Sequence, residues 1–456
     1  MEQTNLTPKE TDYAVLMVER QAGLMGVWAA FFIPTSVFII GFLQKMGASA
    51  WHIGILSSLG IFFQTATLLG SYIFEKYGKP RDIMVGFISS AMIVRFFIAL
   101  IPFLFLSLSS DVKISIVLFI LFTSVGINVI GSAPWIPWLS SIVSTENWGK
   151  FWAKQNMIVI CGGVLTTLIA TKILDIFYSN ITFLLLFAIG TVFGLAAVKV
   201  IAKIPQINIQ PEKIDFLKLI TLPFKSRLFK NFAIYASFFS FARSITLGFG
   251  ILYMLDILKL SYFQIGIYST IGAIVSVFAF GFWGHWVDVF GSKPVLSIAT
   301  VLLGISSFLW LFSTENFTFI VPFIFLLDAI SAPAHTIAFF KFQISSSPVK
   351  KRSVYLSAMT IIVSICGGFA PLLGGAIAQS LKDWSFSIKF WTVYNLHILF
   401  AVSSVLTFLT MFGLKLVEEA NKYRAKDVIK TIFTEEGRHV VKAQIHLVIR
   451  GFGIIG

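Results

Sequence analysis

This chain of 456 residues has few charged residues, few cysteines and none of the common catalytic sequence motifs. Charged residues make up 12% of it, and it contains two cysteines and six histidines. We find no G-x-x-x-x-G-K-[ST] phosphate-binding loop, which argues against direct use of ATP. We also find no His-Glu-x-x-His motif, no Ser–His–Asp arrangement and no cysteine cluster. These absences argue against an enzyme and predict neither a metal nor another cofactor.

What the sequence does contain is mostly apolar. Hydrophobic residues make up 57% of the chain, and the mean hydropathy is +0.87. A soluble protein of this length cannot bury so much apolar surface in one core. A helix of about 20 apolar residues crosses the roughly 30 Å hydrocarbon layer of a membrane. The apolar runs lack strict alternation, so they favour spanning helices over strands.

We therefore predict an all-α membrane protein with twelve transmembrane helices. The predicted spans are 22–43, 52–74, 82–107, 114–140, 157–177, 181–202, 231–255, 263–286, 294–312, 317–341, 354–379 and 388–414.

The formal net charge of +14 is typical of nucleic-acid-binding proteins too, but its distribution indicates a membrane protein. If the N-terminus is cytoplasmic, most of the 35 Lys and Arg residues fall on the cytoplasmic side of the spans. The loops of the other side carry Lys45, Lys113, Lys172, Lys259, Lys382 and Lys389. This positive-inside bias predicts cytoplasmic termini in a plasma or inner membrane, and no nucleic-acid partner.

The chain also repeats itself. The segment Trp51–Gly60 is echoed by Phe263–Gly272 at an offset of 212, and Ile160–Gly163 is echoed by Ile365–Gly368 at an offset of 205. Two repeated membrane halves, with a binding site where they meet, are typical of secondary transporters.

The repeat suggests five segments. They are a cytoplasmic N-terminal segment (1–21), a six-helix half (22–202), a basic cytoplasmic linker (203–230), a second six-helix half (231–414) and a cytoplasmic tail (415–456). The tail alternates charged and apolar stretches, which is consistent with an amphipathic helix on the membrane surface or with a helix that docks a partner.

Two loops at equivalent points of the repeat carry a third pair of matching sequences. Residues Gly284–Pro294 read GHWVDVFGSKP, and residues Ser71–Arg81 read SYIFEKYGKPR. The first of these resembles the G-x-x-x-D-x-x-G-R-K loop signature of the major facilitator superfamily. The other departs from it, with Ser71 in place of the first glycine and Glu75 in place of the aspartate. The resemblance covers about 22–414 and implies the superfamily's two six-helix halves and alternating access.

These loops are the predicted cytoplasmic gate. A carboxylate at a helix end can pair with cations and with helix N-termini, and glycine permits a tight turn. The resemblance implies that such loops latch the two halves together on the cytoplasmic side. The residues concerned are Glu75, Gly78, Lys79 and Arg81 in the first copy, and Asp288, Gly291 and Lys293 in the second.

Prolines interrupt several predicted spans. A proline inside a helix frees a backbone carbonyl and bends the helix. The predicted bends lie at Pro34, Pro134, Pro137, Pro333 and Pro371. In the superfamily, spans 1, 4, 7 and 10 line the central cavity, so bends on spans 1, 4 and 10 suit the rocking of two halves. Many drug–proton antiporters of the superfamily carry an arginine in span 4, and this chain has none there.

Ionisable residues inside spans are costly, so each is a functional candidate. Arg243 lies near the middle of span 7, and Asp328 lies near the middle of span 10. We expect them to pair, because neither can stay charged cheaply in a low dielectric alone. His335 follows Asp328 by two helical turns and so faces the same way. One hypothesis is that Asp328 takes a proton, Arg243 then holds the substrate, and His335 relays the proton. The other is a structural ion pair with a hydrogen-bonded histidine.

The first half supplies weaker candidates. Arg95 lies in span 3, outside the cavity ring of the superfamily, and we expect it to pair within its own half with a helix carbonyl or with Asn128. Gln64 and Asn128 are candidate lining residues.

The predicted function is secondary active transport of a small solute, driven by a proton or solute gradient. Uptake symport of a sugar or organic anion is favoured, and efflux or carriage of a lipid or lysolipid stays open. A membrane sensor or scaffold that binds without transport is the rival from another class. The expected partners are the small-molecule substrate, membrane lipids and a coupling proton. A monomer suffices, because one chain contains both halves.

Overall fold

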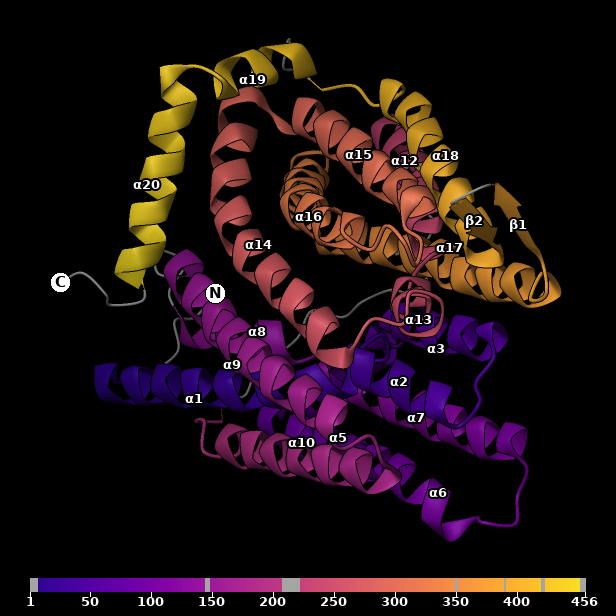
Figure 1. Ribbon diagram of the computed structural model, residues 1–456. Helices are drawn as coiled ribbons and strands as arrows, with labels where there is room; N and C mark the ends of the chain where they lie inside the picture. Colours follow the sequence, from indigo (N-terminus) through magenta and orange to yellow (C-terminus); the bar gives the residue numbers. More distant parts are fainter. Residues whose placement is uncertain are drawn as a thin grey trace. The chain divides into compact units, whose positions relative to one another are not determined.

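The computed structural model describes residues 7–143, 148–206, 222–348, 352–388, 391–419 and 423–451. Within these residues, twelve helical stretches are long and apolar enough to cross a membrane, which confirms the predicted all-α fold (Figure 1). These spans are Pro8–Lys45, Ala50–Tyr77, Pro80–Leu104, Ser110–Ile142, Lys154–Ile176, Asn180–Ile201, Arg227–Asp256, Tyr262–Phe290, Ser292–Phe312, Ile320–Ser345, Val354–Ser380 and Asn395–Lys415.

Several spans consist of more than one helix. The first half contains α1 (Pro8–Phe32), α2 (Val37–Lys45), α3 (Ala50–Phe62), η1 (Phe63–Ala66), α4 (Thr67–Tyr77), α5 (Pro80–Phe96), η2 (Phe97–Leu100), α6 (Ile101–Leu104), α7 (Ser110–Ser132), α8 (Trp135–Ile142), α9 (Trp148–Ile176) and α10 (Asn180–Ile201). The second half contains η3 (Pro223–Lys225), α12 (Arg227–Ser244), α13 (Phe249–Asp256), α14 (Tyr262–Phe290), α15 (Ser292–Leu309), η4 (Trp310–Phe312), α16 (Ile320–Ser345), α17 (Arg352–Ser380), β1 (Ser385–Ile388), β2 (Trp391–Tyr394), α18 (Asn395–Lys415), α19 (Ala425–Ile432) and α20 (Glu435–Gly451).

The helices form two compact units whose internal packing repeats. Unit 1 contains the first half together with residues 247–256 and 260–266, and unit 2 contains the rest of the second half. In unit 1, α1 packs against α9 and α10, and α5 packs against α7 and α10. In unit 2, α12 packs against α17 and α18, and α15 packs against α16 and α18. Each of these helix contacts in unit 2 has an equivalent in unit 1, between the spans at the same positions of the repeat. The sequence repeat is therefore also a repeat of helix packing.

Spans 1 and 7 are interrupted at equivalent points. The first break follows α1 and contains Pro34, and the Ser36 hydroxyl then caps α2 by accepting a hydrogen bond from the Ile39 N–H at 3.2 Å. The second break separates α12 from α13 and contains Gly248, whose φ of 81° lies in the left-handed region that favours glycine. The sequence analysis predicted only the first break, because span 7 contains no proline.

Spans 4 and 10 differ from each other more than predicted. Pro134 lies between α7 and α8, and Pro137 lies in the first turn of α8. By contrast, Pro333 lies inside α16, which continues through it, and Pro371 likewise lies inside α17. Span 4 is therefore two helices, whereas span 10 is one.

The helix of span 1 starts before the predicted span, and one predicted boundary needs correction. The span was predicted from residue 22, and α1 begins at Pro8, where Thr7 and Glu10 form a reciprocal capping box. Span 12 was expected to begin at residue 388, but α18 begins at Asn395. The residues before it form an antiparallel hairpin of β1 and β2, in which Phe386 pairs with Val393. Aromatic and β-branched residues in this segment favour a strand over a helix.

The tail packs partly onto unit 2. Val428 of α19 is fully buried in the core cluster of this unit, with Ile432 and Val440 packed against the same cluster. The contact of α19 with α15 accounts for this burial. The apolar face of the tail is thus at least partly covered by the chain's own second half. Lys422, one of the charged residues at the start of the tail, lies outside the described residues.

Candidate functional site

The two ionisable residues from spans 7 and 10 lie together inside unit 2. Arg243 is near the end of α12, and its Nη2 atom lies 3.2 Å from Oδ1 of Asp328 on α16. The side chains are 26% and 36% exposed, respectively. The contact is thus a single hydrogen-bonded ion pair at a partly open position, and not a fully buried bidentate clamp.

Arg243 has further partners that hold it in place. Its Nη1 atom donates to the Leu303 carbonyl at 3.1 Å and to the Ser307 hydroxyl at 2.6 Å, both on α15. Ser307 Oγ lies 3.3 Å from Ser403 Oγ of α18, and Ser403 donates to the Ala242 carbonyl at 2.7 Å. The guanidinium therefore keeps neutral acceptors on α15 when its bond to α16 is broken.

Asp328 is held much less firmly. Among the described residues, the structure gives its carboxylate one hydrogen-bond partner, which is Arg243. A proton on Asp328 would remove the charge that attracts the guanidinium. The pair is asymmetric, because a change at the carboxylate leaves the arginine anchored, whereas a change at the arginine leaves the carboxylate unpaired.

His335 lies two turns further along α16, in a separate hydrogen-bonded cluster. Its Nε2 atom is 3.1 Å from the Tyr235 hydroxyl, which is also 2.9 Å from the Thr300 hydroxyl. Its ring stacks on Phe239, with the ring centroids 3.8 Å apart. These contacts join α12, α15 and α16 and suit a structural histidine. A proton-relay role for His335 stays a prediction.

Arg95 lies in unit 1, and it is only 3% exposed. Its Nε atom donates to Ser124 Oγ at 2.9 Å, its Nη1 atom donates to the Phe32 carbonyl at 3.1 Å, and its guanidinium lies over the Trp28 ring. Its partners therefore lie within its own half, and they include a helix carbonyl as expected. Asn128 is not among the acceptors of Arg95 in the described part of the chain, and its own buried Nδ2 donor has no hydrogen-bond partner there. Such burial favours a structural role for Arg95.

The two arginines occupy related junctions of the repeat. Ser307, which accepts from Arg243, lies 212 positions after Arg95. Arg243 lies 211 positions after Phe32, whose carbonyl accepts from Arg95. In each half, an arginine therefore links the first span of that half to the third. The arginine is on the third span in the first half (span 3) and on the first span in the second half (span 7). Sequence reasoning missed Ser307, although its repeat offset from Arg95 was a usable signal.

The remaining predicted lining and binding residues do not assemble into a second cluster in the described part of the chain. Gln64 is an exposed residue of η1 in span 2. The cysteines Cys161 and Cys366 are free and partly buried. Among the described residues, no three His, Cys, Asp or Glu side chains are placed to hold a metal ion together.

The second-half gate loop is built around a turn and two carboxylates. Gly291 has a φ of 90°, and it ends α14 and starts α15. Asp288 pairs with Lys341 of α16 at 2.6 Å. Glu419, which follows α18, accepts hydrogen bonds from the backbone N–H groups of Ser292 and Lys293, both at 2.8 Å. A carboxylate thus caps the N-terminus of α15, and the sequence analysis did not anticipate that it comes from the tail.

The first-half loop also has a glycine at positive φ, with a different ψ and with fewer contacts. Gly78 has a φ of 62°, and its N–H donates to the Phe74 carbonyl at 2.8 Å. Arg81 pairs with its exposed neighbour Asp82 at 3.4 Å. Lys79 is exposed before α5, and Glu75 is half-buried in the last turn of α4. Both glycines have a positive φ, which favours glycine, while the gating role of the charged residues stays a prediction.

Asp175 makes a further helix cap inside unit 1. Its two carboxylate oxygens accept hydrogen bonds from the N–H groups of Tyr262 and Phe263, at 2.8 and 2.9 Å. These are the first residues of α14, so the carboxylate satisfies donors that an α-helix leaves unpaired. The sequence analysis did not identify this role of Asp175.

Comparison with known proteins extends these observations. A family model described as the Major Facilitator Superfamily matches residues 232–455, which is about half of the chain. No curated protein sequence matches the chain.

Solved structures share the fold over most of their length. The nucleoside transporter NupG is 15% identical and has a TM-score of 0.62, over 89% of this chain and 99% of NupG. A bacterial homologue of the iron transporter ferroportin is 15% identical with a TM-score of 0.65, over 91% and 100% of the two chains. The xylose transporter XylE from E. coli is 13% identical with a TM-score of 0.64, over 92% and 99%. Residues 232–455 thus match the Major Facilitator Superfamily, and the chain as a whole has the fold of solved transporters, with the same helix packing repeated in its two halves.

Proposed function

We propose that this protein takes up a small hydroxyl-rich or anionic solute, such as a sugar or an organic anion, together with protons. It would do so by alternating access in a cell membrane, with both termini in the cytoplasm and as a monomer. The observation that carries the proposal is the asymmetric, partly exposed pair of Arg243 and Asp328. The carboxylate makes one hydrogen bond and is partly exposed, so it can release the guanidinium at a smaller cost than a fully buried carboxylate in a bidentate pair.

The asymmetry of the pair suggests an order of events. A proton that binds Asp328 removes the carboxylate charge and releases Nη2 of Arg243. The guanidinium stays in place through Ser307 and the Leu303 carbonyl, and it can then donate to a substrate carboxylate or hydroxyl. When the proton leaves, Asp328 competes with the substrate for the same donor. Proton binding therefore favours substrate binding, and substrate binding favours proton binding, as symport requires.

The gate loops supply the conformational part of the proposal. We assign the turn at Gly291 and its pair of Asp288 and Lys341 to a cytoplasmic latch, with the equivalent turn at Gly78 in the first half. Both residues belong to unit 2, so a latch between the halves requires Asp288 to leave Lys341 for a cation of the other half. Asp288 is 77% accessible, so its pair with Lys341 can break and re-form at little cost.

A thermal-stability screen of the purified protein would test the substrate class. Sugars, organic anions, nucleosides and lipids would be compared at about pH 5.5 and about pH 7.5, which bracket the usual range of proton-coupled switches. A ligand at 100 times its dissociation constant stabilises the protein by about 2.7 kcal/mol. We expect a sugar or organic anion to stabilise the wild type and not Arg243→Ala. A ligand that stabilises both equally would place the binding site elsewhere, and stabilisation by lipids alone would favour a lipid carrier.

A further inference from the structure

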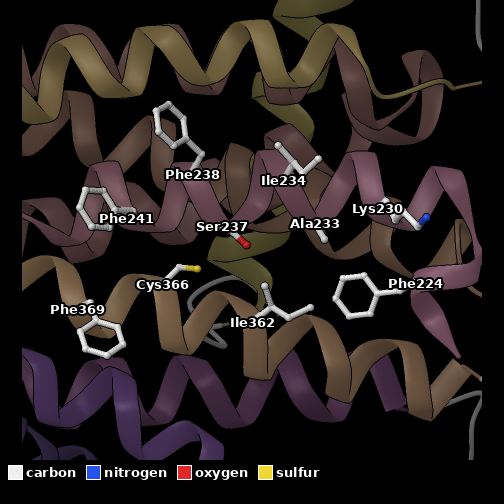
Figure 2. A pocket seen from close by; sticks show the side chains of 10 residues that line it. All are labelled: Phe224, Lys230, Ala233, Ile234, Ser237, Phe238, Phe241, Ile362, Cys366 and Phe369. Atoms are coloured by element: carbon white, nitrogen blue, oxygen red, sulfur yellow. The ribbon is translucent and has the colours of Figure 1, made fainter. Parts of the chain in front are cut away.

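A long apolar groove runs along unit 2 between α12 and α17. Its volume is about 790 Å³, which is in the range of small-molecule and lipid sites. Figure 2 shows Phe224 and Lys230 at one end of the groove and Phe241 and Phe369 at the other, with Cys366 between them. The groove plays no part in the Arg243–Asp328 site described above.

The walls of the groove are two matching helical stripes. Ile234 and Phe241 on α12 are seven residues apart, as are Ile362 and Phe369 on α17, so each pair lies on one helix face. Among the described residues that line the groove, Lys230 alone is charged, and it lies at the end nearest the start of α12. The groove is thus a lengthwise apolar channel with a cation at one end.

The length of the groove matches one leaflet of a membrane. From Lys230 to Phe241, a helix rises about 16 Å at about 1.5 Å per residue. One leaflet contributes about half of a hydrocarbon layer of roughly 30 Å. An acyl chain that lies along the groove would therefore run from the membrane surface to the bilayer midplane.

The charge at the surface end indicates the headgroup. Lys225 of η3 and Arg227 at the start of α12 lie within a few residues of Lys230, and both are exposed. Cations at the end of a spanning helix attract the phosphates of anionic lipids. A neutral acyl ligand would need no such cluster. We propose that the groove binds one acyl chain of an anionic membrane phospholipid, with the lipid phosphate held by Lys230.

Native mass spectrometry with added lipid tests this assignment. The purified full-length protein would be titrated with phosphatidylglycerol and, separately, with phosphatidylcholine of the same acyl chains. We expect one phosphatidylglycerol to stay bound at concentrations where phosphatidylcholine does not. Lys230→Ala should weaken its binding about fivefold, the effect of one juxtamembrane cation. Ile362→Trp should block binding by filling the groove.

Matched variants separate this site from the general lipid-facing surface. Lys199→Ala removes an exposed cation in the last turn of α10, which belongs to unit 1, and Ile365→Trp adds the same bulk on an exposed position of α17 that does not line the groove. Neither should change binding. Equal retention of the two lipids, or equal effects of Lys230→Ala and Lys199→Ala, would overturn the proposal.

Cysteine labelling gives a readout that does not depend on a bulky variant. In a Cys161→Ser background, phosphatidylglycerol should slow alkylation of Cys366 in the groove, and phosphatidylcholine should not. Protection of Cys366 by soluble solutes from the screen, and not by phosphatidylglycerol, would assign the groove to the substrate and contradict the lipid assignment.

Discussion

Replacing Arg243 should destabilise this protein more than replacing Asp328, although the two residues form one ion pair. At 3.2 Å and an effective dielectric constant of about 20, their attraction is about 5 kcal/mol before desolvation. Desolvation and partial exposure offset most of this, so we expect a net coupling of about 1–2 kcal/mol. Arg243→Gln also removes the bonds to Ser307 and Leu303 and leaves Asp328 unpaired, at a total cost of about 3 kcal/mol. Asp328→Asn leaves Arg243 anchored and should cost about 1 kcal/mol.

A double-mutant cycle in detergent measures this asymmetry. The free energy of unfolding would be compared for the wild type, both single variants and Arg243→Gln/Asp328→Asn. The double variant should be more stable than the sum of the single effects predicts, by the coupling energy. The pair of Asp288 and Lys341 is the matched control, because it is shorter but far more exposed, and its coupling should be below about 1 kcal/mol. Equal single-variant effects that add independently would refute the asymmetric anchoring of Arg243.

Three further predictions concern backbone turns and helix caps. Gly248→Ala should lower the unfolding temperature, because Gly248 has a φ of 81° and an added methyl group would also meet the Ser57 hydroxyl. Gly284→Ala is the control and should not lower it, because nothing lies within 4 Å of a methyl group added there. Glu419→Gln should lower the free energy of unfolding by about 1 kcal/mol, because it weakens the cap of α15. Glu418→Gln is the control, and equal effects of the two variants would contradict a capping role for Glu419. Asp175→Ala should speed hydrogen exchange at the amides of Tyr262 and Phe263, and unchanged protection would contradict the cap of α14.

The overall architecture could be predicted from the sequence because it depends on patterns that one chain displays directly. Twelve apolar runs, two copies of the gate loop and two ionisable residues in spans 7 and 10 are visible without any structure. The length of an apolar span and the energetic cost of a charge inside a membrane follow from general physical properties of the bilayer. Arg243 and Asp328 could be matched because a buried charge needs a partner and few candidates were available.

The missed features have weak or non-local signals. A serine in a spanning helix usually bonds to its own helix, as Ser124 also does, so Ser307 and Ser403 did not stand out from the other hydroxyl residues. Glu419 caps a helix whose first residues are more than a hundred positions away, which no local pattern indicates. The break at Gly248 has no proline to mark it, and the hairpin before α18 is too short to interrupt an apolar run.

The most direct test of the proposed mechanism is gradient-driven uptake into proteoliposomes by the wild type and by Asp328→Asn. The solute would be the ligand identified in the thermal screen, and the gradient would be imposed as acid outside. We predict that the wild type accumulates the solute in response to the gradient. Asp328→Asn should exchange solute across the membrane without accumulating it, because Arg243 stays anchored while the site cannot take up a proton. Full gradient-driven accumulation by Asp328→Asn would contradict the coupling role of this carboxylate.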